Sequence, residues 1–141
     1  MNISFITAPF DSKHAPYIAY IRHKVFTVEQ DIDASEDLDG QDPDSIHVLA
    51  KAGNHFIGTG RMMLDGHIGR LAVISDFRNK KIGSNIVLTL INEARNRQLK
   101  SVYLGAQCSA RNFYQKLGFI EYGKIFLEVD IDHIMMKKII Y

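Results

Sequence analysis

The stretch from Arg70 to Ala94 constrains the fold more than any other, because a strand pattern changes directly into a helix pattern. Residues 67–74 predict a buried strand, and residues 83–97 predict a helix with an apolar stripe. That stripe consists of Ile86, Val87, Leu90, Ile91 and Ala94. The linker at residues 78–84 (RNKKIGS) carries three basic side chains and one glycine. Since a helix N-terminus presents unpaired N–H groups and a partial positive charge, this junction predicts a polyanion site; a solvated basic turn is the alternative.

The composition is that of an ordinary globular chain and excludes several classes of protein. A chain of 141 residues fits one domain and can bury a core without disulfides or a structural metal. The net charge of +1 gives no global electrostatic case for binding nucleic acid. The single cysteine, Cys108, excludes an internal disulfide and favours a reducing compartment. Residues 1–16 lack a signal-peptide pattern and no apolar run is long enough to span a membrane, so we expect a soluble cytoplasmic protein.

The first half of the chain predicts a strand, a helix and a meander. The strand is expected at residues 2–8 and the helix at about 13–30, with Ser12 as its N-cap. Three antiparallel strands are expected at residues 46–51, 55–64 and 67–74, joined by the hairpin signals Gly53-Asn54 and Asp65-Gly66. Gly58 and Gly60 lie inside the middle strand, where glycine indicates a bulge or a close backbone approach.

The second half adds a strand at 101–106, a helix at 109–119 that stops at Gly118, and strands at 120–128 and 132–140. The element order is therefore β-α-β-β-β-α-β-α-β-β. It predicts an α/β (α+β) fold with a mixed, mostly antiparallel sheet of about 6–7 strands flanked by helices.

Residues 29–44 form an acidic stretch that is too polar for a core. Its eight carboxylates, half of the sixteen in the chain, are Glu29, Asp31, Asp33, Glu36, Asp37, Asp39, Asp42 and Asp44. A solvated mobile loop is one interpretation, and a surface that attracts a cationic molecule such as a polyamine or a lysine side chain is the other. His47 and Arg61 in the following strands are expected to have local structural partners.

The element order and two motifs resemble the GCN5-related N-acetyltransferase (GNAT) superfamily over almost the whole chain. Residues 78–84 are similar to the acyl-CoA signature Q/R-x-x-G-x-G/A, with Lys81 at the position of the first glycine. Residues 107–119 resemble the later motif N-x-x-A-x-x-[LF]-Y-x-K-x-G-F, with Gln107 replacing the asparagine. The pieces IRHKVFTVEQ, DLDGQD, GTGR and DIDH resemble the small bacterial ElaA/YjcF-like branch. The resemblance implies an acyl-CoA N-acyltransferase fold, with residues 1–141 as a single domain.

The resemblance implies acetyl-CoA as the acyl donor. Its pyrophosphate is expected at the helix start, and its pantetheine arm between splayed strands at 71–73 and 101–106. The expected cofactor-binding residues are Leu71, Ala72, Val73, Arg78, Asn79, Lys80, Lys81, Ile82, Gly83, Ser84, Gln107, Asn112 and Phe113. No metal is expected, because the six histidines lack metal-ligand spacing.

For catalysis, the resemblance implies that Tyr114 protonates the leaving CoA thiolate; a structural core tyrosine is the alternative. An acceptor ammonium has a pKa of about 10.4 and must lose a proton before it attacks. The candidate bases are His133 and Glu29, with Glu128 as a third. Cys108 is expected to be a small buried residue rather than a nucleophile.

The expected reaction is transfer of an acetyl group to a small-molecule or peptidyl primary amine, by direct attack in a ternary complex. Nucleic acid and membranes are not expected as partners. The acceptor, the acyl chain length and the oligomeric state stay open, with a homodimer among the options. Two alternatives are kept: a non-catalytic CoA-sensing or interaction module on the same fold, and an enzyme similar to acyl-homoserine-lactone synthases.

Overall fold

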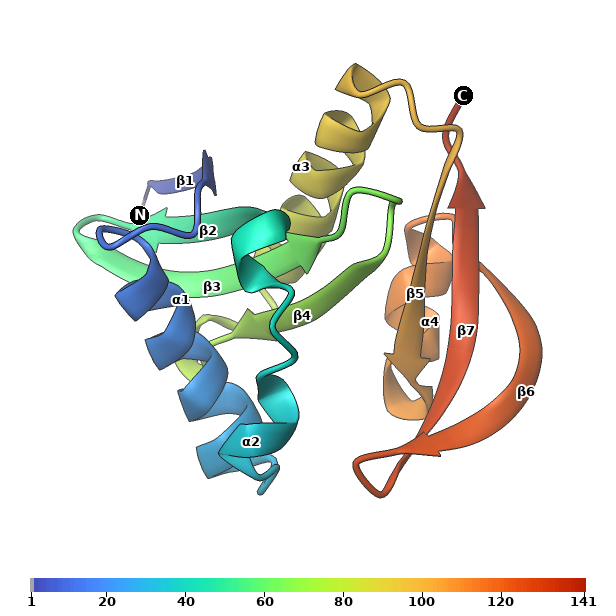
Figure 1. Ribbon diagram of the computed structural model, residues 1–141, viewed down its shortest axis with the longest axis horizontal. Helices are drawn as coiled ribbons and strands as arrows, with labels where there is room; N and C mark the ends of the chain where they lie inside the picture. The colour runs from blue at the N-terminus through green and yellow to red at the C-terminus, as the bar shows by residue number, and fades with distance from the viewer. Residues whose placement is uncertain (1) are drawn as a thin grey trace.

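The computed structural model describes residues 2–141 and contains two antiparallel sheets (Figure 1). The first sheet has the order β1-β2-β3-β4 and the second has the order β5-β7-β6. The strands are β1 (Ile3–Ala8), β2 (Ile46–Ala52), β3 (His55–Met62), β4 (Ile68–Val73), β5 (Ser101–Gln107), β6 (Ile120–Glu128) and β7 (Ile131–Ile139). The seven strands that we expected are therefore present, but they divide into two sheets instead of one continuous sheet.

The helices connect these strands. They are α1 (Ala15–Arg22), the π-helix η1 (His23–Glu29), α2 (Ala34–Asp37), α3 (Ile82–Asn96) and α4 (Arg111–Lys116), with single 3-10 turns η2 (Asp42–Asp44), η3 (Ser75–Phe77) and η4 (Cys108–Ala110). No helix within residues 2–141 combines the length and the apolar character that crossing a bilayer requires.

The first helical segment runs from Ala15 to Glu29, close to the expected range, but its cap differs from the prediction. The Oδ1 atom of Asp11 accepts hydrogen bonds from the backbone N–H groups of Lys13 (3.1 Å) and His14 (2.9 Å). Ser12 is therefore not the capping residue. The N-cap of α1 is His14, whose side chain makes no capping hydrogen bond, and Asp11 binds the two N–H groups just before the helix.

Helix α3 packs closely on the first sheet through the predicted stripe, whose side chains are all fully buried. A Cβ atom added at Gly60 would lie 2.6 Å from Cγ2 of Ile86 and 3.3 Å from Cδ1 of Leu90. One added at Gly58 would lie 3.0 Å from Cδ1 of Ile86. The two glycines therefore let the helix approach strand β3, as their position in the sequence suggested.

We predict that Gly60→Ala destabilises the protein by roughly 1–3 kcal/mol, because overpacking forces the β-branched Ile86 away from its rotamer. Gly69→Ala is the matched control in the neighbouring strand, since nothing lies within 4 Å of a Cβ atom there. Urea unfolding of both variants measures the difference. Equal stability of the two variants would contradict the proposed contact.

The two sheets meet at one end and separate at the other. Strands β4 and β5 run parallel and share one bridge within residues 2–141, between His67 and Tyr103. The N–H of Tyr103 donates to the carbonyl of Gly66 at 3.1 Å. Beyond this bridge the facing edges of β4 and β5 have no strand partner among the described residues. The result is a V-shaped gap between the sheets, visible between β4 and β5 in Figure 1.

Candidate active site

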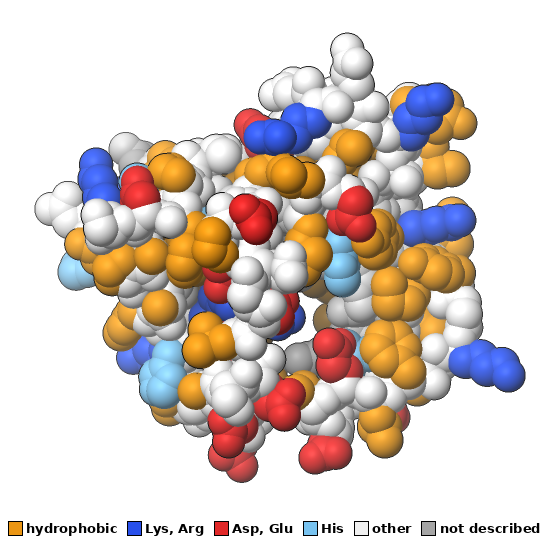
Figure 2. Space-filling model, viewed as in Figure 1, with side chains coloured by type: hydrophobic (Ala, Val, Ile, Leu, Met, Phe, Trp, Pro, Cys, Tyr) orange, Lys and Arg blue, Asp and Glu red, His pale blue; other side chains and the backbone are white. Residues whose placement is uncertain are grey.

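A cleft of about 1040 Å³ occupies the gap between the two sheets. Its walls come from β4 and the start of α3 on one side, and from β5, α4 and the β6–β7 hairpin on the other. Segments η1 and α2 complete the rim. Figure 2 shows the hollow on the face that carries α2, with acidic side chains gathered in the lower part of that face.

The loop before α3 has an unusual backbone. Lys81 is the N-cap of α3 and adopts the left-handed conformation (φ 64°, ψ 16°), and Asn79 is also left-handed (φ 61°). No side chain caps this helix, so N–H groups of its first turn stay available. The lysine at the position of the first signature glycine therefore keeps the backbone shape that a glycine adopts easily, and the uncapped helix start suits an anion.

We predict that Lys81→Gly stabilises the protein by up to about 1 kcal/mol. An L-residue in the left-handed conformation costs about 1–2 kcal/mol, and glycine removes this backbone strain. The greater conformational freedom of glycine in the unfolded chain offsets part of the gain. Lys80→Gly removes the same charge at a position without positive φ and should not stabilise. Thermal unfolding of both variants makes the comparison, and a Lys81→Gly variant no more stable than Lys80→Gly would refute the strain.

Arg78 links this loop to the end of the π-helix. Both terminal guanidinium nitrogens of Arg78 donate to Glu29, one at 2.6 Å, and its Nε donates to the carbonyl of Val73 at 3.0 Å. The hydrogen bonds from Arg78 lower the pKa of Glu29. A carboxylate held in this way is a weak base, and an incoming phosphate must compete with it for Arg78.

Tyr114 lies on α4 and lines the cleft. Its ring packs edge-on against Phe113, with centroids 4.9 Å apart, and near Phe119 at 5.8 Å. Among residues 2–141 no group pairs with its hydroxyl. Burial raises the pKa of Tyr114 to about 12, so the hydroxyl keeps its proton at ordinary pH. The hydroxyl is therefore protonated and has no partner among the described residues, so it can donate to a group bound in the cleft.

His133 lies on β7 directly opposite Gln107 of β5, and it is buried at the wall of the cleft. Its Nδ1 lies 2.7 Å from the carbonyl oxygen of Ile131. Because a carbonyl only accepts, Nδ1 carries the proton in the neutral ring and Nε2 keeps a lone pair. This Nε2 lies 3.7 Å from Oε2 of Glu128, which also lines the cleft. The geometry equips His133 to accept a proton.

The cleft gathers most of the residues named from the sequence. Of the expected site residues, Glu29, Lys80 and Asn112 do not line it: Glu29 pairs with Arg78 at the rim, Asn112 is exposed, and the Nζ atom of Lys80 lies 5.6 Å from the ring centroid of Phe77. The amide of Gln107 donates to Oε1 of Gln30 at 3.1 Å across the cleft. Gln30, His67 and Arg70 also line the cleft, although the sequence predicted no site role for them; Gln30 ends the piece IRHKVFTVEQ, which was the one signal that could have pointed to it.

Arginines hold part of the acidic stretch, while Asp31, Asp33, Glu36 and Asp44 are exposed. Arg22 donates to Asp42 (2.8 Å) and to Asp37 (3.0 Å), and Arg61 donates to Asp42 at 3.0 Å. Arg61 also makes two hydrogen bonds to Asp39, of 2.9 and 2.8 Å. Arg22, Arg61 and Asp42 are buried. These three aspartates are therefore neutralised by arginines and are not free to attract a cation.

His47 completes this charged cluster. Its Nε2 lies 2.9 Å from the carbonyl oxygen of Asp42, and burial lowers the pKa of His47. The local partners expected for His47 and Arg61 are thus confirmed. The cluster fastens residues 37–42 to α1, β2 and β3, and so holds Ile32, Glu36 and Asp37 at the rim of the cleft.

Strand β4 carries a bulge next to this cluster. Its register with β3 shifts between Thr59 and Arg61, and Arg70 has a positive φ of 51°. The guanidinium of Arg70 holds this conformation by contacting the carbonyl oxygen of Asp37 (3.2 Å) and Oδ1 of the same residue (3.1 Å). The bulge bends the strand where Leu71 and Ala72 line the cleft.

The comparisons with known proteins agree with this architecture. The family model described as "Acetyltransferase (GNAT) domain" matches residues 18–140. The chain is 32% identical to "Uncharacterized N-acetyltransferase YjcF" of Bacillus subtilis, covering 84% of this chain and 88% of that protein. It is 33% identical to "Protein ElaA" of Escherichia coli, covering 84% and 82%.

Solved structures show the same fold. The crystal structure of Escherichia coli ElaA superposes with a TM-score of 0.87 at 28% identity, covering 97% of this chain and 99% of that one. An acyl-CoA N-acyltransferase from Pseudomonas aeruginosa superposes with a TM-score of 0.85 at 25% identity, covering 97% and 99%. The expected acyl-CoA N-acyltransferase fold is confirmed, and the chain belongs to the GNAT family of acyl-CoA-dependent acetyltransferases, in its ElaA-like branch.

Proposed function

We propose that residues 1–141 act as one domain that transfers an acetyl group from acetyl-CoA to a primary amine within a ternary complex. One observation carries the proposal. A single cleft joins an uncapped helix start to a protonated tyrosine and to a histidine with a free Nε2 lone pair.

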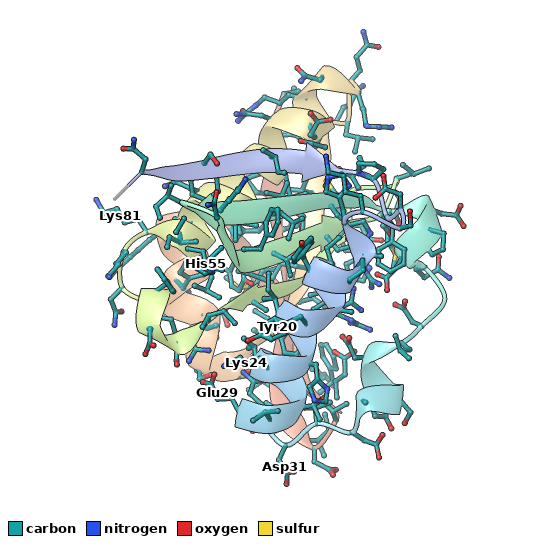
Figure 3. All side chains as sticks on the ribbon, turned by 90° about the vertical axis from the view of Figure 1, so that its left-hand side faces the viewer. Tyr20, Lys24, Glu29, Asp31, His55 and Lys81 are labelled. Carbon is teal, nitrogen blue, oxygen red and sulfur yellow. The ribbon has the colours of Figure 1, made fainter. Side chains whose placement is uncertain are left out.

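The donor is expected to enter from the side of the Lys81 loop. N–H groups at the start of α3 would bind the pyrophosphate, assisted by the basic side chains of Arg78 and Lys81. The unpaired edge of β4 at Leu71–Val73 offers N–H and C=O groups to the pantetheine amides, as an added strand would. We expect the acceptor to enter beside α2. In Figure 3 the Lys81 loop and α2 lie at opposite sides of the molecule, so the two substrates would reach the cleft from different sides.

The chemistry then needs two proton transfers. Nε2 of His133 takes a proton from the acceptor ammonium, directly or through a water. The amine nitrogen attacks the thioester carbonyl carbon, the carbon–sulfur bond breaks, and the hydroxyl of Tyr114 protonates the leaving thiolate. Glu128, 3.7 Å from His133, would stabilise the imidazolium that forms.

The direct test is incubation of the purified protein with acetyl-CoA and a panel of primary amines, with release of free CoA thiol as the signal. Thiol release that depends on the amine supports the proposal. Stabilisation by CoA without turnover on any amine would instead favour a CoA sensor. A lysine in place of the first signature glycine would favour a sensor if it changed the loop, but Lys81 adopts the left-handed backbone that a glycine adopts easily, which supports the transferase instead.

We predict that His133→Asn lowers kcat by about 10²-fold at pH 7, the low end for loss of a general base. The deficit should shrink as the pH rises, because the amine with its pKa of about 10.4 then deprotonates without help. The pH–rate profile measures this recovery. A constant deficit at every pH would indicate a purely structural histidine.

A further inference from the structure

The turn between β6 and β7 contains a residue that does not suit it. The loop has two residues, Val129 (φ 47°) and Asp130 (φ 62°), between the paired residues Glu128 and Ile131. Two-residue turns with positive φ at both positions favour Asn, Asp and Gly. A β-branched valine with positive φ is an outlier. The valine at this position is therefore explained by a role other than forming the turn.

Backbone strain in this protein concentrates at the cleft. Positive φ occurs at the non-glycine residues Asp31, Arg70, Asn79, Lys81, Gln98, Val129 and Asp130. Four of the seven line the cleft: Arg70, Asn79, Lys81 and Val129. Arg70 is held by Asp37, and asparagine tolerates this conformation well. Val129 has neither compensation, which points to a role for its side chain in the cleft.

The surroundings of Val129 indicate what that side chain meets. The β6–β7 hairpin and α2 lie on the two sides of the lower opening in Figure 1, and residues of both segments line the cleft. Apolar side chains line the cleft on both sides of this opening: Ile32 in the loop before α2, and Phe126 on β6. Glu36 and Glu128 line it as well, and neither pairs with an arginine among the described residues. This end of the cleft therefore offers apolar surface together with negative charge, since Glu36 has no ion pair among the described residues and Glu128 faces His133 at 3.7 Å.

We propose that Val129 is a specificity residue, and that the acceptor is a primary amine on an apolar chain or ring. This inference rests on the proposed function. The strained turn is retained because the valine side chain forms an apolar wall against the body of the acceptor, while Glu36 and Glu128 attract its ammonium group. A dicationic polyamine, with a second charge where the apolar wall lies, fits this end less well than a monoamine.

The test compares Val129→Asn with a matched control, Asp130→Gly, in the same turn. Asn is of similar size but polar, and it tolerates positive φ. Asp130 is exposed and does not line the cleft. Both variants relieve strain, so both should raise the midpoint of thermal unfolding, by about 3–5 °C for Val129→Asn. A Val129→Asn protein no more stable than the wild type would overturn the strain argument.

Amine binding is measured by calorimetry on the CoA-loaded protein with hexylamine and ethylamine. The wild type should bind hexylamine at least about tenfold more tightly, because each fully buried methylene is worth roughly a factor of four. Val129→Asn should lose most of this preference, and Asp130→Gly should keep it. Equal binding of the two amines by the wild type, no binding of either amine, or a full preference in Val129→Asn would overturn the inference.

Thiol release measured in parallel separates this inference from the proposed function. Val129-dependent binding of hexylamine without thiol release from acetyl-CoA would keep the apolar subsite and reject the transferase reaction. Equal turnover of hexylamine and ethylamine, unchanged in Val129→Asn, would keep the reaction and reject the subsite.

Discussion

Tyr114→Phe is expected to lower kcat by about 10²- to 10³-fold while leaving the affinity for CoA nearly unchanged. Loss of a general acid typically costs this much, and the substitution removes only the hydroxyl from a ring that stays packed against Phe113. Because burial holds the pKa of Tyr114 at about 12, the wild-type rate should not fall on the alkaline side through ionisation of this acid until well above about pH 10.

Tyr103→Phe is the matched control for this experiment. The hydroxyl of Tyr103 donates to Asp65, which raises the pKa of Tyr103 to about 12 as well, but this residue does not line the cleft. Steady-state kinetics and CoA titrations should therefore distinguish the two variants. A Tyr114→Phe enzyme with nearly full kcat would show that the leaving thiolate takes its proton elsewhere, from water for example.

Asp42→Ala is expected to destabilise the protein by about 3 kcal/mol, the low end for a broken buried ion pair, because Arg22 keeps Asp37 and Arg61 keeps Asp39 as a partner. Burial alone would raise the pKa of Asp42, but the hydrogen-bonded guanidinium groups of Arg22 and Arg61 outweigh burial and lower the pKa. Without this carboxylate, two arginines that are 2% and 3% exposed lose a shared anion. Urea unfolding measures the loss, and the looser rim should also raise KM for the amine.

Asp44→Ala in the same 3-10 turn is the control, since Asp44 is exposed and should change stability by less than about 0.5 kcal/mol. The sign of the pH dependence follows from the lowered pKa of Asp42. The ionised carboxylate stabilises the fold above its unfolded pKa of 3.8, and this contribution is lost as the pH falls through the folded value. Similar unfolding of Asp42→Ala and Asp44→Ala would mean that the cluster contributes little.

Much of the fold could be predicted because its signals are local. The apolar stripe of α3, the hairpin turns and the glycines of β3 appear as spacing within one segment, and the structure confirms them. The acidic stretch could not be predicted in the same way. Its partners Arg22, Arg61 and Arg70 come from α1, β3 and β4, and the pairs with Asp37, Asp39 and Asp42 span 15 to 33 residues along the chain.

The sequence by itself determined where the strand–helix junction with its basic linker lies, that Tyr114 belongs to the later motif, and to which family the chain belongs. Those properties depend on residue type and spacing along the chain. Only the tertiary structure decided that Lys81 adopts a left-handed backbone, that Glu29 is held by Arg78, and that Nε2 of neutral His133 keeps its lone pair. Dihedral angles, ion pairs and tautomers depend on which distant groups the folded chain brings within hydrogen-bond distance. These contacts cannot be read from the order of residues along the chain.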